Sequence, residues 1–352
     1  DDYHHFLAAR GYTKRSMIDD PSYHQNHMAL ISPLPYECTV DHWVGVQTAN
    51  WIAKYDGDDP FAIMVGFPGP HCPYDPPGDF PEVFQPDSMP ASIPEAEGDT
   101  PLLRQNNVDG NKRPWNGVDY TEFTEEHKKK IRAHYAGLVK GIDYEIGLIL
   151  ESLQAKGVLD NTIIIFATDH ADYLGDHNLI GKASFYETCM NIPLLVRVPG
   201  MEPTVSDELV ELRDVTATML ACAGVDRPEN MDSRTLPGLS ISSDEPRDRI
   251  YGLLTDGWMI NDGTWKLAKY ATGENVLFNM ENDPTEQYNL IEDPQYAETL
   301  ARLDIDLTTY VMEEMRHSMF DRLAHAGDMS QDPAFGREGW QQPFPAPVEY
   351  VN

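Results

Sequence analysis

The stretch Thr162-Ile-Ile-Ile-Phe166-Ala-Thr168-Asp169-His170 runs from an apolar segment directly into polar residues. A short apolar run of this kind is typical of a strand buried on both faces of a parallel sheet. A second run, Phe61-Ala-Ile-Met-Val-Gly-Phe67, breaks at Pro68 and is followed closely by His71. Open α/β sheets bind ligands just past the carboxyl ends of their strands. The sequence therefore predicts that His71 and the Asp169-His170 pair lie at such an edge.

The order of elements around these runs favours an α/β fold with a mainly parallel central sheet flanked by helices. Apolar residues at helical spacing predict a helix over 40–55 capped by Asp41. The same spacing predicts a longer helix over 122–155, which starts at Thr121 or Thr124 and ends at Gly157. Residues 72–120 are rich in Pro, Gly, Asp and Asn, which predicts a long surface loop with little regular structure. A strand over 192–198 and a helix over 209–220 complete this part.

The pattern of apolar and turn-forming residues changes near residue 228. Short apolar runs separated by Gly and Asp turns predict a small antiparallel sheet with strands over 249–254, 258–261, 264–270 and 276–278. A helix over 294–316 and a Pro- and Gln-rich tail after Phe320, expected to wrap the surface, follow. We therefore expect residues 1–227 to belong to the α/β domain and residues 228–352 to form a smaller α+β subdomain with its tail.

Composition excludes several classes of protein. The 352 residues include 58 acidic and 26 basic side chains, for a net charge of −32. Such a chain repels the phosphates of nucleic acids and anionic membrane surfaces. No apolar run approaches the roughly 18 residues of a membrane-spanning helix. We expect neither a nucleic-acid partner nor a membrane span; a periplasmic or secreted protein is favoured over a cytoplasmic one, and the oligomeric state stays open.

Three sets of residues suggest chemistry, each with a plainer alternative. Asp169 and His170 can ligate one cation, although Asp and His also form ordinary hydrogen bonds. Lys182 follows the turn at Gly181 and can reach an anionic ligand, although most lysines are simply solvated. His71, fixed between prolines, can transfer a proton, although most loop histidines have no chemical role.

In their order along the chain, these segments resemble the sulfatase family of the alkaline-phosphatase superfamily. Thr168-Asp-His-Ala-Asp-Tyr-Leu-Gly-Asp-His-Asn-Leu-Ile-Gly-Lys182 resembles its second signature region, and Pro70-His-Cys-Pro-Tyr-Asp-Pro-Pro77 looks like its Pro-His-x-Pro motif. Weaker matches keep the same order over 134–147, 192–200, 214–218 and 265–290. The resemblance covers nearly the whole chain.

The resemblance implies a role for each matching residue. Asp169 and His170 would be ligands of a divalent metal, most simply Ca²⁺, with Mn²⁺ or Mg²⁺ as alternatives. Lys182 would bind and stabilise a sulfate or phosphate oxygen, and His71 would contact the leaving-group oxygen. His177 is a further substrate-binding candidate, although we expect it and Asp176 mainly to support the pocket. Asp172 and Asp75 are additional candidates for the pocket lining.

The family's nucleophile is a formylglycine made from the first residue of a Cys/Ser-x-Pro-x-Arg motif. Cys38, Cys72, Cys189 and Cys222 do not lead such a motif, nor do they form a CxxC pair, so we expect mostly free thiols, with at most one disulfide, and no nucleophile in this chain. We expect the nucleophile and the remaining metal ligands in an N-terminal segment absent from residues 1–352. The chain alone would then have half a metal site and an exposed sheet edge, and would be inactive and poorly stable.

The favoured function is the metal-dependent hydrolysis of a small-molecule or carbohydrate sulfate monoester. Two alternatives stay open: a phosphonate monoester or phosphodiester hydrolase on the same scaffold, and a non-catalytic remnant.

Overall fold

The computed structural model describes residues 2–13, 21–78, 80–96, 100–113, 116–228, 231–239, 244–254 and 256–325. The chain divides into two compact units, residues 1–292 and residues 293–352. This division lies later in the chain than the boundary expected between residues 227 and 228, which stays a prediction. In the described part of the second unit, the 3₁₀ turn Pro294–Tyr296 leads into helix α9, Ala297–His325. Helix α9 confirms the predicted final helix, whereas the rest of the expected tail lies outside the described residues.

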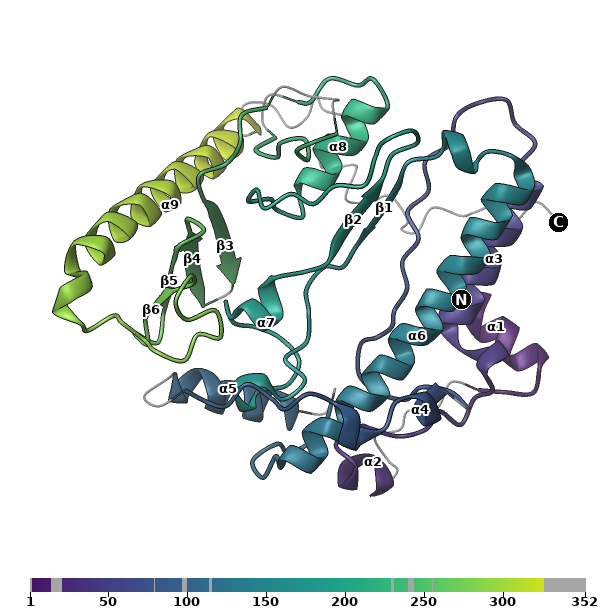
Figure 1. The fold of residues 1–352 in the computed structure, drawn as a ribbon, viewed down its shortest axis with the longest axis horizontal. Coiled ribbons are helices and arrows are strands. Elements are labelled where there is room, and N and C mark those ends of the chain that lie inside the picture. Colours follow the sequence, from purple (N-terminus) through teal and green to yellow (C-terminus); the bar gives the residue numbers. More distant parts are fainter. Residues whose placement is uncertain are drawn as a thin grey trace. The chain divides into compact units, whose positions relative to one another are not determined.

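In the first unit, helix α3 (Val40–Lys54) runs alongside the long helix α6 (Glu125–Lys156), as Figure 1 shows. The two backbones approach closely at Gly45, where a Cβ atom would collide with the Glu145 side chain. His42 Nδ1 lies 2.9 Å from Glu145 Oε1, and the Ser152 hydroxyl donates to Ala49 O at 2.8 Å. This packing fixes the scaffold on which the candidate site is carried.

Both of these helices have side-chain caps close to the predicted positions. Thr124 accepts a hydrogen bond from His127 N and starts α6, and Gly157, with φ +77°, ends it in the left-handed conformation that glycine tolerates best. These two boundaries are confirmed. The cap of α3 is Thr39, whose hydroxyl accepts from His42 N, and not Asp41. Asp41 instead accepts from Gly69 N at 3.0 Å, a distant contact that local sequence does not reveal.

Strands β1 (Ile164–Ala167) and β2 (Leu194–Arg197) form a two-stranded sheet. They pair antiparallel, with Ile165 opposite Val196, although the alternation of elements favoured parallel pairing. The run 61–67 is not a strand: its residues have no regular secondary structure, and Met64 is 94% exposed. A strand requires a hydrogen-bonded neighbour, and among the described residues none lies beside this run, which an apolar pattern alone cannot foresee.

The small antiparallel sheet has the order β3-β4-β5-β6, which confirms the predicted strands within one or two residues. Its strands are Ile250–Leu254, Gly257–Asn261, Trp265–Tyr270 and Val276–Asn279. Buried Met259 and Phe278 of this sheet share one apolar cluster with Phe185 and Tyr186. The sheet therefore supports the segment that directly follows Lys182.

The remaining helices are short. They are α1 (Asp2–Ala9), α2 (Pro21–Gln25), α4 (Phe80–Val83), α5 (Pro101–Asn111), α7 (Glu187–Met190) and α8 (Asp214–Cys222). Helix α5 corrects the expectation of a long irregular loop over 72–120. Its first free N–H groups, at Leu102 and Leu103, are capped by Glu274, 171 or more residues away in sequence. Within the described ranges no helix is long and apolar enough to cross a membrane.

Candidate active site

The structure brings His71 and Lys182 together although 111 residues separate them. Lys182 Nζ lies 3.2 Å from His71 Nε2, and both side chains are exposed. His71 Nδ1 lies 2.8 Å from the carbonyl oxygen of Cys72, so this nitrogen carries the proton and donates. Nε2 is then left as the acceptor for the lysine. The pair presents an ammonium and an imidazole to solvent at one point of a strongly acidic protein.

Asp172 connects the two loops that carry this pair. Its carboxylate accepts from the Tyr74 hydroxyl at 2.8 Å, close after His71, and from Gly181 N at 3.0 Å, just before Lys182. Leu174 N donates to it as well, at 2.9 Å. Burial raises the pKa of Asp172, and these hydrogen bonds act to lower it. Asp172 therefore positions the loops that carry His71 and Lys182. The sequence suggested Asp172 only as a candidate for the pocket lining.

Asp169 and His170 follow directly after β1, as predicted. His170 Nδ1 donates to Ala171 O at 2.9 Å, and its Nε2 lies 3.3 Å from Asp169 Oδ2. Although partial burial acts to raise it, His170 and backbone N–H groups hold the pKa of Asp169 below its usual range. An ionised carboxylate and an imidazole nitrogen are suitable metal ligands. Among the described residues, however, no three His, Cys, Asp or Glu side chains are arranged to hold a metal ion.

The backbone between these groups adopts unusual conformations. Leu174, His177, Asn178 and Ala183 have φ values of +48°, +52°, +58° and +99°. Non-glycine residues rarely adopt positive φ, and such strained positions gather at functional sites. Four of them within ten residues show that surrounding contacts, and not local preference, determine the path of this segment.

Arg132 of α6 supplies much of that support. Its guanidinium donates to Leu174 O at 3.0 Å and to Pro90 O at 2.8 Å, and it forms an ion pair with Asp176. Asp176 also accepts from Ile93 N at 2.7 Å. Helix α6 thereby holds both the loop before α5 and residues 168–182, called the signature segment below.

His177 is buried and does not reach the surface. Its ring is stacked on Tyr186 with centroids 4.0 Å apart, and the residue is 2% exposed. This placement suits the supporting role we expected, and a direct contact between His177 and a substrate stays a prediction.

Cys72 is adjacent to His71 but is poorly suited to act as a nucleophile. Its Sγ lies 3.5 Å from His71 Nδ1. Burial, with a further contribution from Asp172, raises the pKa of the thiol to about 12. The reactive form of cysteine is the thiolate, which is scarce at neutral pH under these conditions.

Asp75 is a half-buried carboxyl group four residues after His71, and its raised pKa implies that the stability of the protein depends on pH. Burial, together with the nearby Asp41, raises the pKa of Asp75 to about 7. An unfolded Asp titrates near ~4, so the unfolded state releases this proton first as pH rises. The contribution of Asp75 to stability is present below pH ~4 and is lost as pH rises to about 7.

We therefore expect Asp75→Asn to become progressively more stable relative to wild type as pH rises from ~4 to ~7, with no further gain above that range. Urea unfolding at several pH values measures this difference. Asp87→Asn, an exposed substitution, is the control and is expected to show a constant difference. A constant difference for Asp75→Asn would contradict the assignment.

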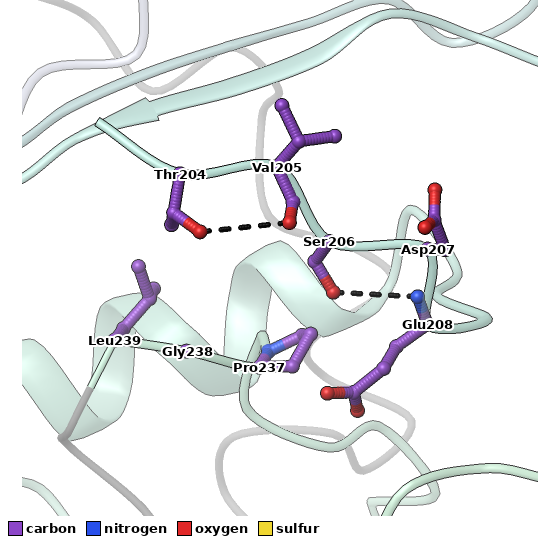
Figure 2. Close-up of a pocket in the computed structure, with 8 residues that line it drawn as sticks. All are labelled: Thr204, Val205, Ser206, Asp207, Glu208, Pro237, Gly238 and Leu239. Atoms are coloured by element: carbon purple, nitrogen blue, oxygen red, sulfur yellow. Dashed lines mark hydrogen bonds between the residues drawn. The ribbon is translucent and has the colours of Figure 1, made fainter.

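Two cavities stand out in the described part of the first unit. One, of about 210 Å³, adjoins Lys182 and is lined by residues of α5, the signature segment and the small sheet. The other, of about 540 Å³, lies between residues 204–208 and 237–239 (Figure 2). Two of its hydrogen bonds, from Thr204 Oγ1 to Val205 O and from Glu208 N to Ser206 Oγ, join neighbouring residues of one loop. Its lining residues include Asp207 and Glu208 but no cation, so the smaller cavity is the one associated with the candidate site.

The structure thus gives two pairs of polar side chains, Asp169 with His170 after β1 and His71 with Lys182 between two loops. The sulfatase family model matches residues 3–225, and the model for the C-terminal part of N-sulphoglucosamine sulphohydrolase matches residues 175–313. The chain belongs to the sulfatase family.

Similar proteins agree with this assignment. An arylsulfatase of Clostridium perfringens is 28% identical over 270 residues, which cover 74% of this chain and 55% of that protein. A choline-sulfatase of Rhizobium meliloti is 29% identical over 67% of this chain and 47% of its own length. This chain thus spans about half the length of these relatives.

Among solved structures, the phosphonate monoester hydrolase of Agrobacterium radiobacter matches with a TM-score of 0.70 and 21% identity. The match covers 90% of this chain and 69% of that one. BT4656, solved with D-glucosamine-2-N,6-O-disulfate, matches with a TM-score of 0.61 and 19% identity over 79% of this chain and 69% of its own. Both share the alkaline-phosphatase fold, which confirms the predicted fold class.

Proposed function

We propose that the protein hydrolyses a sulfate monoester. The observation that carries the proposal is the contact between Lys182 Nζ and His71 Nε2, 3.2 Å apart and open to solvent. The two groups have no evident structural need to meet, since Asp172 already joins their loops from beneath. An ammonium and an imidazole at one exposed point suit an oxyanion that carries a leaving group.

In this proposal the two side chains divide the work. The Lys182 ammonium pairs with a sulfate oxygen and stabilises the charge that grows there as the ester bond breaks. An anion bound between them favours a protonated His71, whose Nε2–H then donates to the oxygen of the departing alcohol. Asp172 holds both loops so that these positions are set before substrate arrives. The attacking nucleophile, expected to be a formylglycine, would come from a segment outside residues 1–352.

Asp169 and His170 fit as two ligands of a divalent cation. The hydrogen bond from His170 Nδ1 to Ala171 O orients the ring, and a ligating histidine usually makes such a bond through its other ring nitrogen. His170 Nε2 lies 3.3 Å from Asp169 Oδ2, so that one cation could bind both atoms. A cation bound there would polarise the sulfate oxygens. Oxygen ligands favour Ca²⁺, with Mg²⁺ as an alternative, and the imidazole also admits Mn²⁺.

Metal dependence supplies the test. We expect full-length protein to hydrolyse nitrophenyl sulfate, to stop when a chelator removes the cation, and to recover when Ca²⁺ is restored. Asp169→Ala removes one ligand and is expected to raise the metal concentration for half-maximal rate by roughly 10–100-fold or more. Asp160→Ala, an exposed change just before β1, is the control. A rate of hydrolysis that changes neither with the chelator nor in Asp169→Ala would contradict the proposed ligands.

A phosphonate monoester hydrolase is the second candidate. The structural match to the Agrobacterium enzyme favours it, and a sulfate and a phosphonate group are close in size and charge distribution. The sulfatase-named relatives favour a sulfate ester instead. Carbohydrate and small-molecule sulfates both remain within the proposal.

A further inference from the structure

The cavity of about 210 Å³ beside Lys182 indicates where the rest of the substrate lies. Lys182 lines this cavity and is also the residue proposed to bind the ester oxyanion. The group that enters the cavity is therefore the one bonded to the sulfate. Ligand sites usually measure roughly 300–1,000 Å³. A cavity below that range admits one small ring and not a chain of several sugars.

The walls of this cavity are fixed from two sides. The Glu274 carboxylate binds Leu102 N at 2.9 Å and Leu103 N at 3.0 Å, and thus fastens the start of α5 to the turn between β5 and β6. The Asn107 amide bonds both backbone groups of Ile180, with Nδ2 to O at 2.8 Å and N to Oδ1 at 3.3 Å. Helix α5 is therefore held against the signature segment before any ligand enters.

The floor is equally constrained. Tyr173 is 1% exposed and its hydroxyl bonds Ser184, while the Tyr270 hydroxyl accepts from Phe185 N at 3.2 Å. These rings offer an apolar surface with polar atoms at the edge, which suits a ring that carries hydroxyl groups.

Two charged side chains line the cavity. Among its lining residues, all of them in the described part of the chain, Asp256 is the one acid and Lys182 the one base. Asp256 lies in the turn between β3 and β4 and is exposed. Lys182 is already assigned to the ester oxyanion, so a second anionic group on the substrate would meet a carboxylate with no cation to offset it.

We propose that this cavity binds the alcohol part of the substrate, and that Asp256 selects a neutral, hydroxyl-bearing ring over one with a further sulfate or carboxylate. The assignment rests on the proposed function. A carboxylate accepts hydrogen bonds from ring hydroxyls, whereas two like charges about 6 Å apart at a partly exposed site disfavour binding by about tenfold.

The test compares a glucose monosulfate with a glucose disulfate that carries one further sulfate. For full-length protein, the ratio of the two kcat/KM values is measured in wild type, Asp256→Asn and Asp58→Asn. The last variant removes the same charge from an exposed turn far along the chain. If neither ester is turned over, calorimetric titration with the same two esters gives the ratio of their Kd values instead.

We expect wild type and Asp58→Asn to prefer the monosulfate by about tenfold, and Asp256→Asn to lose most of that preference, chiefly through KM for the disulfate. A ratio that Asp256→Asn leaves unchanged would overturn the cavity assignment while turnover upholds the proposed function. Absent turnover with a Kd ratio that shifts in Asp256→Asn would overturn the proposed function and support the cavity assignment.

Discussion

Lys182→Ala is expected to lower kcat/KM for nitrophenyl sulfate by roughly 10²–10³-fold, the usual effect of removing one donor from a developing oxyanion. The lysine is exposed, and its ammonium contacts His71 Nε2 without a buried carboxylate partner in the described structure. Its removal should therefore leave folding intact and act on the reaction. Steady-state kinetics and thermal unfolding of the same preparation separate the two effects.

The control for this change is Lys54→Ala, which removes an exposed lysine from the end of α3. We expect it to stay within about twofold of wild type, because surface substitutions away from a site rarely matter. Lys182→Arg should recover only part of the lost rate, since a planar guanidinium does not replace a compact ammonium. Equal losses in Lys182→Ala and Lys54→Ala would show that net charge, and not this position, is responsible.

Lys266→Met is expected to destabilise the protein by about 3–5 kcal/mol, the cost of leaving a buried charge without its partner. Lys266 is 1% exposed, and its Nζ lies 2.7 Å from Glu286 Oε1, 2.6 Å from Glu187 Oε1 and 2.9 Å from Phe185 O. Glu286 Oε2 in turn accepts from Glu187 N at 2.7 Å. This cluster joins β5 to the segment just after Lys182.

The loss should appear as a Tm lower by roughly 6–20 °C. Burial raises the pKa of Glu286 to about 7 against the opposing effect of Lys266, so the loss should shrink as pH falls and this carboxyl takes up a proton. The double variant Lys266→Met/Glu286→Gln is expected to recover part of the stability, because the fully buried carboxylate is no longer left without its cation and only the more exposed Glu187 is. A double variant as unstable as the single one would indicate that lost packing, and not charge, is the cause.

The fold was predictable wherever local pattern decides it. Helix α6 and the four strands of the small sheet follow from apolar spacing and turn residues, and Gly157 marks a helix end by its own conformational preference. Helix α5 was not predictable, because its cap is Glu274 on another element. The run 61–67 has the composition of a strand, but among the described residues no other strand is hydrogen-bonded to it. Composition alone does not reveal whether a neighbouring strand is present.

The candidate site shows the same division. Residue type and order indicate His71, Lys182, Asp169 and His170 as site residues. The structure adds two contacts, one between the side chains of His71 and Lys182 and one between those of Asp169 and His170. The supporting residues were harder to find. Arg132 sits on the buried face of α6, where sequence would place an aliphatic residue, and only the carbonyl groups it meets explain a guanidinium there.

The Lys182–His71 site is proposed to act on a sulfate ester. The most direct measurement is a pair of assays on full-length protein, with a sulfate ester and a phosphonate ester of the same nitrophenol, so that the leaving group is identical. We predict a higher kcat/KM for the sulfate ester, with both activities reduced in Lys182→Ala. Faster cleavage of the phosphonate ester, or no release of nitrophenol from the sulfate ester, would contradict it.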